Sequence, residues 1–421
     1  MKYGKLYVAA TLLIVVLLGC SKSEITPAPL IDEQNLANTT PIPGTTMKKM
    51  EGIYKLVGGT GELGAEFVCK VSKYRVSFFS EKDGIFFILK YGLKPSDGSI
   101  QFSGFYRYSE FPTQGSIQFS VAAAEGATDL LAGVISNLKM RGNVSNDSIS
   151  LQYQHAFSTY ATNNPFIIFA HHGVQTTSNP PYAENSLNGV LNDENYGVTG
   201  LEFDVRMTSD HVPICIHDPG INTRLTEKGP LSGSWDQYPF PLISQYIRLI
   251  DGQKVPSVEQ VLNAFVDSTT LKYIWLDLKG NTDIFKYLEP IVRNAYARAV
   301  AQNRDVMIIT GLPSADVIDE LKKQPTYNST NPAFAYSAPL PMLAEQSLDL
   351  AIENKGSFFG PRFSEGLLLD EVNEAHSKGI KVISWTLNGK NVIVDYLKNG
   401  KFDGFITDYP AYVAYHFYTM F

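Results

Sequence analysis

Two carboxylates and a histidine, spaced as in a metal or acid/base site, lie close together near the middle of the chain. Glu202 and Asp204 alternate with apolar residues, and His217 ends the next apolar run. The residues between, Val205 to Ile216, have the turn-type pair Asp210-His211 at their centre, which predicts a β-hairpin with a two-residue turn. In that register Asp204 faces His217, and Glu202 points to the same side because alternate strand residues share a face. The pattern predicts two oxygen ligands and one imidazole in a single space.

The alternative interpretation of this segment is a surface hairpin with scattered charges. Against that alternative, the other face of the predicted hairpin is apolar, with Phe203, Val205, Ile214 and Ile216. A strand pair with one apolar face is normally held against a core. We therefore expect the polar face to line a site.

The elements that position this hairpin follow an alternation of strand-like and helix-like patterns that begins after Pro165. Helical patterns at 257–266, 285–302, 314–323 and 367–378 lie between short apolar runs. Eight strand–helix units in roughly 260 residues fit a (β/α)₈ TIM-type barrel, whose active site lies at the C-terminal ends of its strands. The eight candidate strands are 166–170, 200–205, 273–279, 305–310, 333–337, 357–360, 381–386 and 404–407.

Polar residues gather at the C-terminal ends of these candidate strands. Carboxylates, two histidines and a lysine at one barrel mouth suit phosphate ester chemistry, because imidazoles can transfer protons. Oxygen ligands favour Ca²⁺ or Mg²⁺ over Zn²⁺ as a bound divalent cation. In chain order the strand-end residues are His171 with His172, Glu202 with Asp204, Asp277 with Lys279, Trp385, and Asp408.

The region from about residue 52 to 157 has a different pattern, with strand-like runs separated by turn signals. Asp83-Gly84 and Asp97-Gly98 are typical hairpin turns, and the best helix candidate is Thr128 to Leu138. This predicts a small antiparallel β-sandwich or barrel. Its many Phe and Tyr side chains are better explained by core packing than by a ligand groove. Examples of the strand-like runs are 66–79, 84–91, 99–108, 116–122 and 148–155.

The N-terminus has the pattern of a bacterial lipoprotein signal. Lys2 and Lys5 precede an uncharged run that ends in Leu17-Leu18-Gly19-Cys20. The run is too short for a membrane span and suits a signal peptide, with Cys20 as the lipidated residue. The alternative is an ordinary secretory signal with a chance cysteine. We expect a signal peptide at 1–19, a tether at 20–47, an antiparallel β-domain at 48–160 and a TIM-barrel domain at 161–421, held by a lipid anchor in the bacterial cell envelope, facing the periplasm or the cell surface.

The cysteines and the net charge argue against a structural disulfide and against nucleic-acid binding. After Cys20, Cys69 and Cys215 are the two that remain, and they fall in different predicted domains, so we expect buried free thiols. The net charge is −7 and the pI is about 5.6. Nucleic-acid binding is disfavoured because it needs clustered Lys and Arg.

Taken in order, the motifs of residues 166 to 415 resemble those of the glycerophosphodiester phosphodiesterase family. Many ordered matches are more specific than any single one. His171-His172-Gly173 stands where the family has His-Arg-Gly, and Glu184-Asn185-Ser186 stands where it has Glu-Asn-Thr. The other matches are Glu202-Phe203-Asp204, His217-Asp218, the helix start at 256–262, the Glu-x-Lys-like strand Trp275-Leu276-Asp277-Leu278-Lys279, Trp385-Thr386-Leu387-Asn388 and Ile406-Thr407-Asp408-Tyr409-Pro410.

The resemblance implies a role for each matching residue. His171 and His217 would be the general acid/base pair, and Glu202, Asp204 and Asp277 would bind the metal. Lys279 and His172 would contact the phosphate, and Trp385 would form an apolar wall of the substrate pocket. Two residues depart from the family pattern. His172 replaces an arginine, and with an ordinary pKa near 6.5 it would be charged part of the time. Asp277 replaces a glutamate and has a shorter side chain.

Several alternatives stay open at this stage. Glu184 and Asn185 could both cap the first helix, and Glu184 could instead reach the metal or a base. Asp408 is best explained as a turn residue or helix cap. The aromatics after His217-Asp218 either cover the mouth or form a local core: Trp235, Tyr238, Phe240 and Tyr246.

The substrate and the chemistry also stay open. The expected reaction is hydrolysis of a glycerophosphodiester to glycerol 3-phosphate and an alcohol. Rivals are a phospholipase-like barrel acting on lysophospholipid or phosphoinositide, and a non-catalytic binding lipoprotein. The choice between Ca²⁺ and Mg²⁺, the leaving alcohol, the acid and base assignment of the histidines, the nucleophile, the role of the β-domain and the oligomeric state are undetermined.

Overall fold

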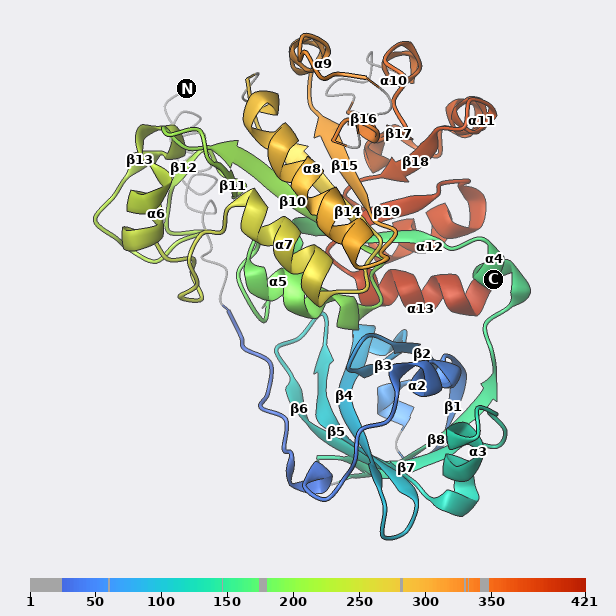
Figure 1. Ribbon diagram of the computed structural model, residues 1–421. Coiled ribbons are helices and arrows are strands. Elements are labelled where there is room, and N and C mark those ends of the chain that lie inside the picture. Colours follow the sequence, from blue (N-terminus) through green and yellow to red (C-terminus); the bar gives the residue numbers. More distant parts are fainter. Residues whose placement is uncertain are drawn as a thin grey trace, which may run out of the picture.

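The computed structural model describes residues 25–421 except 60, 146, 174–179, 281–282, 329–330, 332 and 341–347. The expected signal peptide and Cys20 lie outside the described residues. Two eight-stranded barrels, one antiparallel and one parallel, lie next to each other (Figure 1). This is the fold class that the sequence predicts.

The N-terminal barrel is a closed antiparallel meander. Each strand pairs with the next, and the last pairs with the first. Asp83 and Gly84 both have positive φ, as a tight hairpin turn between β3 and β4 requires. The strands are β1 (Gly52–Gly58), β2 (Glu66–Val71), β3 (Val76–Phe79), β4 (Ile85–Lys94), β5 (Ser99–Tyr108), β6 (Gln114–Val121), β7 (Lys139–Val144) and β8 (Asp147–His155).

Some expectations for this barrel were wrong. The run 66–79 is two strands, because Ser72 N–H donates to Arg75 O and turns the chain. β7 was missed because its alternation is broken by Gly142, where a Cβ would meet the ring of Phe119. The predicted helix is shorter, α3 (Ala127–Leu131), and Gly133 with positive φ follows it. Strand β1 was also missed.

Aromatic side chains fill the interior of the antiparallel barrel. Phe67 and Phe87 have ring centroids 5.2 Å apart, and Phe78, Phe102 and Phe119 belong to the same buried cluster. Core packing is therefore the correct explanation for these residues. Cys69 in this barrel and Cys215 in the other are buried and free, as expected.

The C-terminal barrel is parallel and nearly closed. Its strand order is β16-β15-β14-β10-β9-β19-β18-β17. Between β16 and β17, Ser357 N–H donates to Ser337 O at 2.9 Å. The strands are β9 (Ile167–Ala170), β10 (Gly200–Met207), β14 (Tyr273–Leu278), β15 (Met307–Leu312), β16 (Ser337–Pro339), β17 (Phe358–Phe359), β18 (Lys381–Ser384) and β19 (Gly404–Thr407).

One parallel strand was misplaced in the sequence interpretation. The apolar residues Ala333 and Phe334 are not in β16, because Asn331 accepts from Ala333 N–H with its side chain and from Phe334 N–H with its carbonyl. These bonds form a turn, and the strand begins at Ser337. The predicted strand at 333–337 is therefore shifted toward the N-terminus.

Helices cover the outside of the parallel barrel. The first long one, α7, begins at Ser257, whose hydroxyl and the side chain of Gln260 form a reciprocal capping box. The α-helices of the described chain other than α3 are α2 (Gly44–Met47), which lies at the antiparallel barrel, α4 (Thr159–Asn163), α5 (Leu187–Asn192), α6 (Phe240–Tyr246), α7 (Val258–Ser268), α8 (Phe285–Ala301), α9 (Ala315–Lys322), α10 (Asp349–Glu353), α11 (Leu369–Ser377), α12 (Lys390–Asn399) and α13 (Pro410–Met420).

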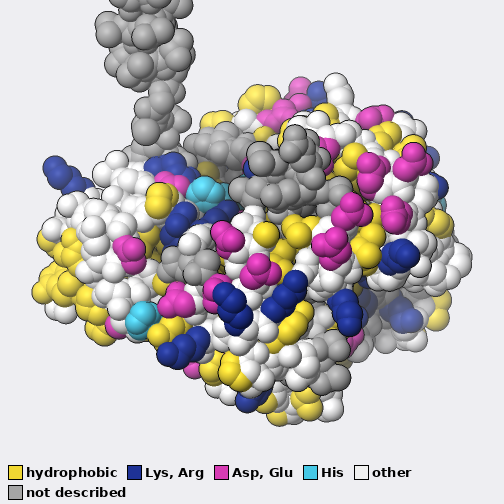
Figure 2. All heavy atoms as spheres, turned by 90° about the horizontal axis from the view of Figure 1, so that it is seen from above, with side chains coloured by type: hydrophobic (Ala, Val, Ile, Leu, Met, Phe, Trp, Pro, Cys, Tyr) yellow, Lys and Arg dark blue, Asp and Glu magenta, His cyan; other side chains and the backbone are white. Residues whose placement is uncertain are grey.

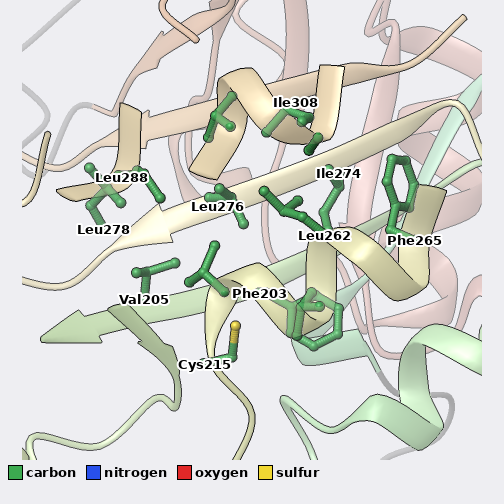
Figure 3. Packing of buried hydrophobic residues seen from close by; sticks show 14 of the residues in the cluster. Phe203, Val205, Cys215, Leu262, Phe265, Ile274, Leu276, Leu278, Leu288 and Ile308 are labelled. Carbon is green, nitrogen blue, oxygen red and sulfur yellow. The ribbon is translucent and has the colours of Figure 1, made fainter. Parts of the chain in front are cut away.

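Strands β10 and β14 divide their side chains between two sides. Phe203 and Leu276 point outward, into the core that these strands share with α7 and α8 (Figure 3). The alternate residues, Glu202, Asp204 and Asp277, are turned away from that core. Since side chains alternate along a strand, the apolar outward set forces the carboxylates to the inside of the barrel.

The hairpin on β10 forms, but the predicted register is off by one residue. Val205 pairs with Cys215 of β11 (Pro213–Cys215), so Asp204 does not face His217. The loop is longer than two residues, because His211 N–H donates to Thr208 O and His211 has φ of 61°. Consequently Cys215 packs with Val205, whereas Ile214 and Ile216 join a separate cluster.

The two barrels are joined by α13, which lies between them (Figure 1) and packs on β2 and β3. Lys70 Nζ lies 3.2 Å from the hydroxyl of Tyr418, and Ser72 Oγ donates to Asn195 Oδ1 at 2.7 Å. One buried apolar cluster contains residues of both barrels, including Phe79 and Val413. The barrels therefore share a core as well as polar contacts.

On the face seen from above, acidic and basic side chains are interspersed (Figure 2). Among the residues that the structure describes, no helix is long and apolar enough to cross a membrane.

Candidate active site

A small pocket opens at the C-terminal ends of the parallel strands. Its volume is about 100 Å³, roughly the space of three water molecules. It is the place where the strand-end residues meet, as a TIM barrel requires. The lining residues are His171, Glu202, His217, Trp275, Asp277, Lys279, Leu340, Trp385, Thr386 and Ile406.

His171 directly follows β9 and is held by Asp408, which directly follows β19. Nδ1 of His171 lies 2.7 Å from Oδ1 of Asp408. Burial lowers the pKa of His171, and the neighbouring His172 lowers it further. The hydrogen bonds from His171 and Asn388 keep the pKa of Asp408 low in spite of burial. An ionised carboxylate can only accept, so Nδ1 carries the proton and Nε2 is free to accept one.

His217 is held in the same way by its neighbour Asp218. Nδ1 of His217 lies 2.8 Å from Oδ1 of Asp218. Arg224 donates to Asp218 at 2.7 and 3.0 Å and also to Glu184. Trp235 Nε1–H donates to Asp218 O at 2.9 Å. Each histidine therefore has one ring nitrogen fixed by a carboxylate.

Three carboxylates form the polar side of the pocket. Asp204 and Asp277 are at the same level on paired strands, and Glu202 is two residues before Asp204. Each offers an oxygen within 4.8 Å of the others. Asn185 fixes Asp204 by donating to Oδ2 at 2.8 Å and accepting from its backbone N–H at 2.9 Å.

The electrostatics of this trio are strongly coupled. Burial and the charge of Asp204 raise the pKa of Glu202 to about 8. Burial also raises the pKa of Asp277. Burial acts in the same direction on Asp204, but the charges of His172 and Lys279 outweigh it and hold its pKa well below the usual range. Lys279 Nζ lies 2.6 Å from Asp277 and 3.0 Å from Asp204.

His172, which was expected to contact the phosphate, is not among the residues that line this pocket and instead contacts carboxylates. Its backbone N–H donates to Glu202 Oε2 at 2.7 Å, and its ring lies between Asp204 and Glu184. Burial lowers the pKa of His172, but these two carboxylates outweigh it and raise the pKa to about 10. These two carboxylates favour the charged form of His172 more than its ordinary pKa implies. The backbone turns here because His172 has φ of 54°, and at Gly173 a Cβ would meet the ring of Phe203.

Two tryptophans and aliphatic residues form the apolar side of the pocket. Trp385 Nε1–H donates to Gly360 O at 2.6 Å, which fixes the ring against the pocket. Trp275 fills the barrel interior below, and a Cβ at Gly311 would lie 2.6 Å from its Nε1. Trp385 thus lies where an apolar wall was expected.

Several residues have roles that the sequence interpretation missed or left open. Asp408 was expected as a turn residue or cap, but α13 has Tyr409 at its N-cap position and Asp408 holds His171. Ser186, not Glu184 or Asn185, caps α5. Arg224 was not singled out, and no signal other than its place after His217-Asp218 distinguishes it.

Three of the four aromatics in the segment after Asp218 form a local core, whereas Tyr246 is exposed. Trp235 is buried in a cluster with Ile214 and Ile216, and Tyr238 and Phe240 pack against it. None of them lines the pocket described above. The segment also contains the short strands β12 (Gly220–Ile221) and β13 (Gly233–Ser234).

Two carboxylate-held histidines beside a carboxylate trio, at the mouth of a (β/α)₈ barrel, have the geometry of an acid/base active site. Proton transfer at two points and binding of a cation or phosphate oxygen are the reactions that these groups can support.

Comparison with known sequences identifies the family. Residues 171–412 match the profile of the glycerophosphoryl diester phosphodiesterase family. The match covers more than half of the chain, which therefore belongs to this family of enzymes. No curated protein matches the chain.

Solved structures similar to this chain come from several organisms. One is a glycerophosphodiester phosphodiesterase from Parabacteroides distasonis, with 19% identity, covering 58% of this chain and 93% of that one, at a TM-score of 0.44. Another is an Oleispira antarctica phosphodiesterase in complex with the product sn-glycerol-3-phosphate, with 17% identity, 60% and 96% coverage and a TM-score of 0.44. A glycerophosphodiester phosphodiesterase from Thermotoga maritima has 18% identity, 58% and 96% coverage and a TM-score of 0.41.

Proposed function

We propose that the protein hydrolyses glycerophosphodiesters to glycerol 3-phosphate and an alcohol by acid/base catalysis with His171 and His217, assisted by a divalent cation. Family membership supports the substrate class. The observation that carries the two-histidine assignment is that both imidazoles line one pocket, and each has Nδ1 on its own carboxylate.

The two histidines would act at opposite ends of the reaction. Nδ1–H of each ring donates to Asp408 or Asp218, so Nε2 is the atom available to the substrate. His171, whose pKa is lowered, suits proton acceptance from the attacking hydroxyl. His217 would then donate a proton to the oxygen of the leaving alcohol. Each positioned acid or base typically contributes about 10²–10⁴-fold to the rate.

The carboxylate trio fits a hard divalent cation. Glu202 and Asp204 are buried, Asp277 beside them is partly buried, and the repulsion visible in the raised pKa of Glu202 would be relieved by a positive ion. These three residues would hold Ca²⁺ or Mg²⁺, which when bound would neutralise charge on the phosphate. Lys279, next to Asp204 and Asp277, supplies a second positive charge at the same edge.

The test is release of glycerol 3-phosphate from glycerophosphocholine, with lysophosphatidylcholine as a parallel substrate. Wild type and His171→Ala are assayed with Ca²⁺, with Mg²⁺ and with a chelator. We expect release by the wild type with a cation and almost none by the variant. No release from either substrate under any condition would reject the proposal, and release that is unaffected by the chelator would reject the metal.

A further inference from the structure

The chain that follows the predicted lipidation site is held across both barrels. We define the N-terminal strap as residues 26–40. Its first residue, Thr26, donates its backbone N–H to Pro180 O at 3.0 Å and accepts from Arg107 Nη1 at 2.8 Å. Further along, Thr40 N–H donates to Leu93 O at 2.7 Å. The strap is therefore attached to the parallel barrel at one end and to the antiparallel barrel along its length.

The attachment point on the parallel barrel belongs to the mouth. Pro180 lies in the connection from β9 to α5, and the loops that follow parallel strands are on the active-site face. Four residues later in the same loop, Glu184 contacts the ring of His172. The chain therefore enters the folded body at the connection from β9 to α5, where the two barrels meet.

Chain length limits how far a lipid on Cys20 can be from this point. Six residue steps separate Cys20 from Thr26, and an extended chain spans at most about 3.3–3.6 Å per residue, or roughly 20 Å. A body of about 260 residues has a radius of gyration of roughly 18 Å, which makes it more than about 40 Å across. The segment from Cys20 to Thr26 is too short to let the mouth turn away from the bilayer.

The rim of the mouth has side chains suited to a bilayer surface. The loop after β17 exposes Phe363 (38% exposed), and Leu369 at the start of α11 is 41% exposed. Between β17 and Phe363, the guanidinium of Arg362 lies 4.9 Å from the ring centre of Trp385, which lines the pocket. Aromatic, aliphatic and arginine side chains together are typical of the membrane interface.

From these two observations we propose that the mouth of the parallel barrel faces the bilayer that holds Cys20, with Phe363 and Leu369 in contact with the lipid. The inference rests on lipid attachment at Cys20, which the sequence predicts, and not on catalysis. Its consequence is that the active site meets substrates at or released from the membrane surface before those in bulk solvent.

The experiment measures orientation directly, with the full-length lipidated protein in vesicles of phosphatidylethanolamine and phosphatidylglycerol. Fluorophores are attached at Ser364→Cys, beside Phe363, or at Val300→Cys. Val300 is 73% exposed and lies in the last turn of α8, at the far end of the barrel. The native Cys69 and Cys215 are buried and do not compete. We expect a lipid-borne quencher to quench the Ser364 probe several-fold more than the Val300 probe.

A matched control removes both causes of orientation. It carries a twenty-residue Gly-Ser insertion after Ser23 together with Phe363→Ser and Leu369→Ser. We expect equal quenching of the two probes, while hydrolysis of soluble glycerophosphocholine is unchanged. The inference would be overturned if the two probes were quenched equally in the protein without the insertion, or if their difference survived in this control. It would also be overturned if Cys20 carried no lipid. Because quenching does not depend on turnover, an inactive enzyme would count against the proposed function alone.

Discussion

The two barrels of this protein have the same number of strands, yet one carries the candidate chemistry and the other does not. In the parallel barrel all strands end at one face, so residues far apart in sequence, such as His171 and Asp408, meet at one mouth. In the antiparallel barrel successive strands end at opposite faces, so polar strand ends are divided between the two. Strand direction, rather than strand number, concentrates functional groups.

Burial raises the pKa of acidic groups in both barrels, but in the parallel barrel a counter-charge opposes it at Asp204. In the antiparallel barrel, burial raises the pKa of Tyr54 and of Cys69 well above their usual values, which favours their neutral forms. In the parallel barrel, buried carboxylates are kept beside His172 and Lys279, which stabilise charge. The charge of Asp204 therefore depends on the cations beside it.

The largest expected effect comes from histidine truncation. His171→Ala and His217→Ala should each lower kcat by about 10²–10⁴-fold, because each removes a positioned proton-transfer group. The control is His155→Ala in β8 of the antiparallel barrel, where the exposed ring contacts only a neighbouring carbonyl among the described residues. Steady-state release of glycerol 3-phosphate distinguishes them. A comparable loss in His155→Ala would remove the functional contrast between the barrels.

Asp408→Asn should lower kcat by roughly 10²-fold, because His171 loses the carboxylate that orients its ring. It should also move the acidic limb of the rate profile to lower pH. Asp408 raises the pKa of His171 against the effect of burial, so without it His171 is protonated only in more acidic solution. The matched control is Asp403→Asn, which breaks a similar pair with His376 away from the pocket. A pH profile that does not move in Asp408→Asn would contradict the base role of His171.

Asp277→Asn should weaken the apparent affinity for the divalent cation by at least about tenfold, because one anionic ligand of the trio is lost. Activity titrated against Ca²⁺ and Mg²⁺ gives the apparent affinity. The control, Glu62→Gln, removes an exposed carboxylate from the antiparallel barrel. An unchanged titration in Asp277→Asn would show that this residue is not a ligand and that its shorter side chain does not reach the metal.

Much of the fold could be predicted because the two barrels have different local patterns. The sequence predicts long apolar alternations such as β5 and capped amphipathic helices such as α7, because local propensity and burial agree there. Strand β7 was not recognised, because its pattern is interrupted by Gly142, where a Cβ would meet the backbone of Gln118 and the ring of Phe119 on β6. The hairpin register was missed because it depends on His211 adopting a left-handed conformation, which favours a longer loop than the Asp210-His211 pair suggests.

The candidate site was predictable where its residues stand at strand ends, and not where long-range contacts decide. His171, Glu202, Asp204, His217, Asp277 and Lys279 converge as expected. That Asp408 holds His171 depends on the adjacency of β9 and β19, which are separated by more than 230 residues. The charge of His172 depends on two carboxylates whose distance from its ring no motif specifies.

The smallest expected effect on turnover comes from the core of the antiparallel barrel. Phe87→Ala removes a fully buried ring that contacts Phe67, Phe78 and Phe119, and it should lower the free energy of unfolding by about 3–5 kcal/mol. The described lining of the active-site pocket contains no residue of this barrel. We therefore expect kcat and KM of the folded variant to match the wild type below its unfolding transition. A changed kcat in a fully folded Phe87→Ala protein would show that strain crosses α13, which packs on both barrels, and that the antiparallel barrel supports the geometry of the site.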